Sequence, residues 1–143
     1  MTEQMSVKIA ALPSLRLTVE AHGLMAKKAL GQNFLLDQNI TDKIINLSLQ
    51  KQNKKDFSGA NVFEVGPGPG GLTRAVLAAE PKSLTVVEMD ERCIAIMNEI
   101  KEKTGDILHI INGDAMQTDF SVLAPAPRHI VSNLPYNISV PLL

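Results

Sequence analysis

The chain has 143 residues, 45% of them hydrophobic, and a formal net charge of −1. This length suits one domain, and no apolar run approaches the roughly 20 residues of a membrane-spanning helix. The charge excludes the whole-chain basicity of many nucleic-acid-binding domains, although residues 1–55 are net basic and form either a phosphate-facing patch or an ordinary solvated surface. A single cysteine and three scattered histidines predict no internal disulfide, no metal site and a reducing compartment, the cytoplasm.

The first third of the chain is predicted to be a helical arm. We expect residues 1–12 to be disordered or loosely attached, and residues 13–58 to form the arm. Its first helix opens at Ser14 and ends at Gly23. Residues 27–35 follow no regular period and combine two lysines, a glycine, two amides and an aromatic ring. This composition fits equally well the lining of a pocket and a connector beneath the core.

A second helix of the arm is predicted to begin at the N-cap Asn39. Its core-facing residues are predicted to be Ile40, Ile44 and Leu47. Residues 51–58 then form a polar linker, and after it residues 59–143 form the main α/β unit.

The strongest signal is a glycine-rich loop between a predicted strand and a predicted helix. Residues 62–65 indicate a short buried strand, and the loop at residues 66–71 reads GPGPGG. The loop has no bulky side chain, so a ligand can approach its backbone closely. From Leu72 on, the apolar residues follow a helical spacing. A strand, a glycine loop and a helix in this order form the usual site of a nucleotide-type cofactor.

Two details indicate which cofactor this loop would bind. Glu64 stands two residues before the first glycine, and a carboxylate there favours a ligand with a cationic group and repels a pyrophosphate. Pro67 and Pro69 lack the backbone N–H donors on which a pyrophosphate cradle depends. Both details favour S-adenosylmethionine, with its ammonium and sulfonium charges, over NAD. The alternative is a Gly/Pro-rich turn that binds nothing.

Three further strands are predicted at residues 83–87, 107–111 and 129–132. The order of strands and helices with short connections predicts a parallel, doubly wound α/β sheet. Polar side chains stand at the predicted strand ends, namely Glu64, Glu88, Asp114 and Asn133. In such a sheet these side chains meet at the carboxyl edge, where ligands bind. Glu88 is spaced from the glycine loop to bind ribose hydroxyls, and Asp114 could accept from an adenine amine or cap a turn.

The residues after the last of these strands suit methylation of an exocyclic amine. The lone pair of adenine's amino group is delocalised into the ring, and two hydrogen-bond acceptors on its N–H groups would localise it. The side-chain oxygen of Asn133 is one such acceptor, and the Leu134 carbonyl, held extended by Pro135, is the other. Tyr136 offers a face on which an extruded base can stack. Catalysis here would be by positioning and electrostatics; the alternative is a strand, a proline turn and a buried tyrosine.

The sequence resembles the ribosomal RNA small-subunit adenine-N6 dimethyltransferases. Residues 65–73 (VGPGPGGLT) and 133–139 (NLPYNIS) carry the resemblance, and residues 27–35, 88–92 and 113–115 also match. It extends from about residue 15 to the end of the chain. The resemblance implies a Rossmann-like S-adenosylmethionine methyltransferase fold. It further implies transfer of four methyl groups to the N6 atoms of two adjacent adenosines near the 3′ end of small-subunit ribosomal RNA, within an immature subunit.

The resemblance also assigns roles to individual residues. It places residues 32–35 at the methionine side of the cofactor, with the Phe34 ring closing over the target base. Glu64 and Gly66 would meet the methionine moiety, Glu88 the ribose and Asp114 the adenine. The cofactor-binding residues that it implies are Gln32, Asn33, Phe34, Leu35, Glu64, Gly66, Gly68, Glu88, Met89, Asp114, Ala115 and Asn133. The catalytic residues that it implies are Asn133, Leu134, Pro135 and Tyr136.

One departure from the family is the end of the sequence at Leu143, directly after the catalytic motif. Family members continue with more strands and a helical C-terminal domain, so the chain looks like an N-terminal portion with a truncated sheet of about four strands. We expect its fourth strand to expose an edge that could pair with another chain. We also expect this chain alone to bind cofactor weakly and transfer methyl groups poorly.

Three other functions remain open from the sequence. A large-subunit ribosomal RNA adenine methyltransferase would share the glycine loop and the Asn-x-Pro-aromatic motif. A non-catalytic ribosome assembly factor could keep the methyltransferase shell. An NAD enzyme would need phosphate contacts that the two loop prolines disfavour.

Overall fold

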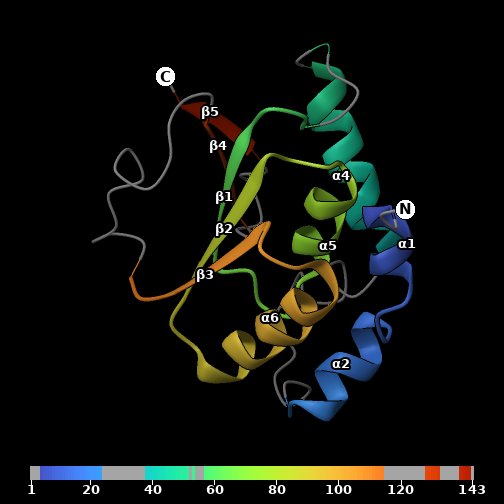
Figure 1. The fold of residues 1–143 in the computed structure, drawn as a ribbon, viewed down its shortest axis with the longest axis vertical. Helices are drawn as coiled ribbons and strands as arrows, with labels where there is room; N and C mark the ends of the chain where they lie inside the picture. The colour runs from blue at the N-terminus through green and yellow to red at the C-terminus, as the bar shows by residue number, and fades with distance from the viewer. Residues whose placement is uncertain are drawn as a thin grey trace.

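The computed structural model describes residues 4–23, 38–51, 53, 57–114, 128–132 and 139–142. Its centre is a five-stranded sheet in the spatial order β3-β2-β1-β4-β5 (Figure 1). The strands are β1 (Asn61–Val65), β2 (Ser83–Glu88), β3 (Leu108–Asn112), β4 (Arg128–Ser132) and β5 (Ser139–Leu142). The first four strands are parallel, as predicted, and each lies within one residue of its predicted position.

The described helices lie on one side of this sheet (Figure 1). They are α1 (Met5–Ala10), α2 (Leu15–Ala21), α4 (Gln38–Lys51), α5 (Gly71–Ala78) and α6 (Glu91–Thr104). Helix α5 contacts α4 and α1, and α6 contacts β2 and β3. Within the described ranges, no helix has the length and apolarity that crossing a membrane requires.

The core forms where β1 and β2 meet the helices. Both strands are nearly continuous apolar runs, which is typical of parallel strands covered on both faces. Val62 and Phe63 point to opposite faces of β1, and both are fully buried. From α5, Leu72 and Val76 join the same cluster as Val62. Each such side chain contributes about 1.5–3 kcal/mol through burial.

The N-terminal segment is more ordered than predicted. Residues 5–10 form α1, and Ile9 lies in the core with only 8% of its surface exposed. Met5 and Leu12, spaced from Ile9 as on one helical face, pack against the same core. The prediction of a disordered N-terminus is therefore wrong for these residues, because their few apolar side chains find a surface on the helices of the main unit.

The core-facing stripe of α4 differs from the prediction by about one residue. Thr41, Ile45 and Leu49 are buried, whereas Leu47 is 51% exposed. The helix begins at Gln38, so the predicted N-cap Asn39 lies inside it. The segment expected to be a polar linker also contributes to the core, since Phe57 is buried and its N–H donates to the Ala79 carbonyl at 2.9 Å.

The prediction that the fourth strand exposes an open edge is wrong. Strand β5 pairs antiparallel with β4, so β4 has a hydrogen-bonded neighbour on each side. Pro141 of β5 pairs in register with His129 of β4. Proline cannot donate to a ladder and is confined to edge strands, which agrees with the outermost position of β5 among the described strands.

Gly70 closes the turn into α5, and a side chain there would require the ends of two core side chains to shift. Its φ is +95°, and a Cβ atom there would lie 2.9 Å from Ile100 Cδ1 and 3.1 Å from Met97 Cε. Gly59 has a similar φ of +77°, but a Cβ atom there would meet nothing within 4 Å.

These two glycines make a matched pair for a stability test. We expect Gly59→Ala to lower the free energy of unfolding by about 1 kcal/mol, the cost of left-handed backbone for alanine. Gly70→Ala should cost roughly 1–2 kcal/mol more, because the added methyl overpacks the core. Urea unfolding followed by circular dichroism measures both values. Equal losses in the two variants would contradict the steric account of Gly70.

Candidate active site at the carboxyl edge of the sheet

The carboxyl ends of the four parallel strands meet at one edge. Val65 at the end of β1 pairs in register with Val87 of β2 and with Ser132, the last residue of β4. At the end of β2, Glu88 pairs with Asn112, the last residue of β3. The predicted residues Glu64, Glu88 and Asp114 therefore belong to strand ends that lie side by side.

The glycine loop leaves β1 at this edge and keeps its backbone accessible. The Gly66 N–H donates to the Val87 carbonyl at 3.0 Å, which fixes the start of the loop against β2. Gly66 has a φ of +65°, and a Cβ atom there would meet no described residue within 4 Å. The described residues thus leave the loop backbone at Gly66 uncovered, as a site that receives a ligand against its main chain requires.

Glu88 is held at the tip of β2 by three backbone donors. Its Oε1 accepts from the Gly68 N–H at 3.3 Å, and its Oε2 accepts from the N–H groups of Met89 and Asp90 at 2.8 and 3.0 Å. These bonds tie the carboxylate to the glycine loop and to the start of α6. Met89 beside it is 66% exposed, so its flexible thioether is free to pack on a ligand.

Glu64 is fully buried, unlike Glu88. Its Oε1 accepts from the Thr73 hydroxyl at 2.5 Å, and its Oε2 has no hydrogen-bond partner among the described residues. Burial raises the pKa of this carboxyl to about 8; the Thr73 hydrogen bond opposes the rise and the nearby Glu88 charge adds to it. A buried carboxyl oxygen without a partner is costly unless a donor or a cation reaches it.

Asp114 follows β3 by two residues and is half-buried. The preceding residue, Gly113, donates its N–H to the Glu88 carbonyl at 3.0 Å. This bond holds the turn after β3 against the end of β2. The structure therefore brings Asp114 to the same edge as Glu88, in the order that the sequence predicted.

The C-terminal end of α2 is held against α6, beside this edge. Arg92 at the start of α6 donates to the Gly23 carbonyl at 3.3 Å and pairs with Asp90 at 2.9 Å. His22 contacts Glu99 of α6 at 3.1 Å. These contacts place the chain leaving α2, four residues before the stretch 27–35, next to the first turns of α6.

A family model for ribosomal RNA adenine dimethylases matches residues 23–143. The chain belongs to this family. It is 50% identical over 133 residues to ribosomal RNA small subunit methyltransferase A of Gluconobacter oxydans, and the match covers 93% of this chain and 42% of that protein. The protein of the same name from Allorhizobium ampelinum is 51% identical over 133 residues, with 92% and 46% covered. The chain thus spans less than half the length of these two relatives.

The fold of the chain is also similar to a solved structure. A Pyrococcus horikoshii protein proposed to be an RNA methyltransferase superposes with a TM-score of 0.55 at 15% identity, over 80% of this chain and 51% of that one. This likeness and the parallel sheet confirm the predicted Rossmann-like α/β class. The antiparallel β5 is the addition that the prediction lacked.

Several predicted site residues lie outside the described residues and stay predictions. They are Gln32, Asn33, Phe34, Leu35, Ala115, Asn133, Leu134, Pro135 and Tyr136. Asn133 directly follows Ser132 in the sequence, and Ser132 is the end of β4 at the candidate edge. No group of three or more residues that could hold a metal occurs in the part of the chain that the structure describes.

Sequence reasoning missed two buried polar contacts of α5. It gave no role to Thr73, the donor to Glu64, and none to Arg74, which is buried and donates to the Thr18 hydroxyl of α2 at 3.3 Å. Burial lowers the pKa of Arg74. Adjacent residues on a helix face different neighbours, so Thr73 contacts Glu64 of the sheet and Arg74 contacts Thr18 of the arm.

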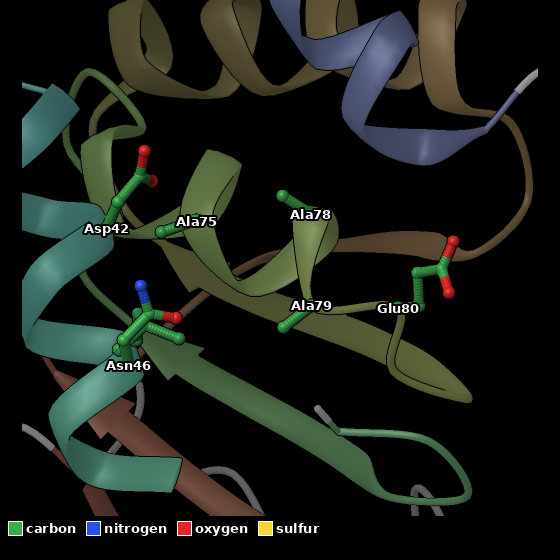
Figure 2. A pocket seen from close by; sticks show the side chains of 7 residues that line it. Asp42, Asn46, Ala75, Ala78, Ala79 and Glu80 are labelled. Atoms are coloured by element: carbon green, nitrogen blue, oxygen red, sulfur yellow. The ribbon is translucent and has the colours of Figure 1, made fainter. Parts of the chain in front are cut away.

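Two described hollows lie away from the candidate edge. One has a volume of about 340 Å³. Figure 2 shows it where the short side chains of Ala75 and Ala78 on α5, and of Ala79 just after that helix, leave room beside Asp42 and Asn46 of α4. Another of about 320 Å³ lies along α1 and α5. Neither contains a residue predicted to bind the cofactor, so these hollows carry no part of the candidate active site.

Proposed function

We propose that the protein transfers methyl groups from S-adenosylmethionine to the N6 atoms of two adjacent adenosines in small-subunit ribosomal RNA. Membership of the ribosomal RNA adenine dimethylase family over residues 23–143 supports this proposal. The observation that carries it is the pair of carboxylates beside the open glycine loop, Glu64 with an unpartnered oxygen and Glu88 held by backbone donors. Substrate binding within an immature small subunit, in the cytoplasm, follows from the same proposal.

The described residues fit this cofactor. The cofactor carries an ammonium and a sulfonium charge, and the free oxygen of Glu64 is a buried acceptor that only a donor or a cation would satisfy. The described residues leave the backbone at Gly66 uncovered for a ligand. Glu88 stands where an acid binds ribose hydroxyls, and Asp114 stands beyond it for the adenine amine. Residues 32–35, Gly68, Met89 and Ala115 complete the proposed cofactor site.

When bound, the cofactor supplies an electrophilic methyl group. The chain's own contribution is to orient the acceptor amine. The Asn133 side-chain oxygen and the Leu134 carbonyl accept hydrogen bonds from the target N–H groups and localise the nitrogen lone pair. Pro135 restricts Leu134 to extended backbone, and Tyr136 and Phe34 stack on the base. These groups are positioned before reaction, so they stabilise the transition state without reorganisation.

Methyl transfer to purified ribosomal subunits tests the proposal. We expect the protein to transfer labelled methyl from S-adenosylmethionine to unmethylated small subunits, slowly when this chain is used alone, with N6-dimethyladenosine as the product after digestion. Large subunits should remain unlabelled. Label in large subunits would indicate the large-subunit enzyme, and binding to small subunits without transfer would indicate an assembly factor; either result would contradict the proposal.

A further inference from the structure

The two carboxyl groups at the candidate edge differ in how their oxygens are satisfied. Both oxygens of Glu88 accept backbone N–H groups, from Gly68 on one side and from Met89 and Asp90 on the other. In the part of the chain that the structure describes, Glu64 has one hydrogen-bond partner, the Thr73 hydroxyl, and its buried Oε2 has none. Of these two carboxyl groups, Glu64 is therefore the one with an oxygen that accepts no hydrogen bond from the described residues.

The surroundings of Glu64 disfavour its charged form. Among the described residues, the charged group that acts on this carboxyl is Glu88 of β2, and it repels a second negative charge. On α5, Thr73 donates one hydrogen bond and Arg74 turns its guanidinium to Thr18 of α2. No described cation compensates the buried carboxylate.

We infer that Glu64 is protonated in the ligand-free protein and releases its proton to solvent when the cationic part of the cofactor docks against its free oxygen. This inference depends on the proposed cofactor. The bond that breaks is the carboxyl O–H, the proton passes to the buffer, and an ion pair replaces it, so charge is conserved. Glu64 then selects for a cationic ligand, because a neutral or anionic one offers nothing to offset its ionisation in a buried site.

Cofactor affinity should depend on pH, because the pKa of Glu64 differs between the free and the ligand-bound protein. The free carboxyl titrates near pH 8, and a bound cation lowers its pKa because it favours the carboxylate. Between the two values, binding releases about one proton, and affinity should rise close to tenfold per pH unit. The ligand's own α-amino group, with an ordinary pKa of about 7.7–8.0, stays charged below pH 7 and adds nothing there.

Isothermal titration calorimetry with S-adenosylmethionine at pH 6.5 measures the released proton. The observed enthalpy is compared in phosphate and in imidazole buffer, whose ionisation enthalpies differ. We expect a slope of about one proton released for the wild-type protein. Glu64→Gln should bind more weakly and release none. Glu91→Gln, which changes an exposed carboxylate in the first turn of α6, should match the wild type.

Clear binding with no proton released would overturn this inference and leave the proposed function intact. Proton release that persists in Glu64→Gln would also overturn it, because the proton would come from another group. Absence of any binding would count against the proposed function as well. If Glu64→Gln fails to bind, the wild-type affinity between pH 6 and 7 decides the matter: a tenfold rise supports the inference and a flat profile overturns it.

Discussion

Asn133→Ala is expected to lower the rate of methyl transfer by about 10²–10³-fold, the usual cost of removing one preorganised polar contact to a reacting group. The amide oxygen of Asn133 is proposed to accept a hydrogen bond from the target amine, and alanine offers no acceptor. Cofactor affinity should fall much less, because the carboxylates and the glycine loop remain. Single-turnover transfer to unmethylated small subunits and a calorimetric affinity for S-adenosylmethionine measure the two effects separately.

Asn98→Ala is the matched control for this experiment. Asn98 lies on α6 with an exposed side chain, and its loss should leave both the rate and the affinity unchanged. A rate for Asn133→Ala within a few-fold of the wild type would refute the proposed role. Retained affinity together with lost transfer would show that the defect lies at the methyl acceptor and not in the cofactor site.

The sheet and its active edge could be predicted because their signals are local. β1 and β2 are apolar runs bounded by turn residues, and the caps Ser14 and Asp90 accept backbone N–H groups as their residue types indicate. The order of strands and helices then fixes the parallel topology. This topology was enough to predict that Glu88 and Asp114 lie at the carboxyl edge of the sheet.

The short elements could not be predicted because tertiary contacts form them. The six residues of α1 and the four of β5 are too few for a periodic pattern, and they become regular only against the core and against β4. The prediction of which face of α4 is buried was wrong for another reason. Ile44 and Ile45 are adjacent, so apolar spacing alone allows two faces, and the buried face includes the polar Thr41.

The chemistry of Glu64 shows the same limit at the site. Its place at the end of β1 follows from the sequence, and so does its suitability for a cation. Its complete burial, its bond to Thr73 and its free oxygen depend on how α5 packs over β1, which no local pattern encodes. The strand end was predictable, but the protonation state was not.

Glu64→Gln is expected to stabilise the fold at neutral pH while weakening the cofactor site. The unfolded carboxyl titrates near 4.5 and the folded one near 8, so the folded state holds its proton more tightly. The free energy of unfolding of the wild type should therefore fall as pH rises from about 4.5 to 8 and then level off. Glutamine does not ionise, and its oxygen can still accept from Thr73. The free energy of unfolding of the variant should therefore not show this fall with pH.

The gain from Glu64→Gln should be near zero at pH 4.5 and of the order of 3 kcal/mol at pH 7. Urea unfolding of both proteins across this range measures it, with Glu91→Gln as an exposed control that should show no such trend. A constant difference between wild type and Glu64→Gln at all pH values would mean that the pKa of Glu64 is the same in the folded and the unfolded protein. A buried carboxyl group that lowers stability is expected at a site where it binds a cation. Lower affinity for S-adenosylmethionine should therefore accompany the gain in stability of Glu64→Gln.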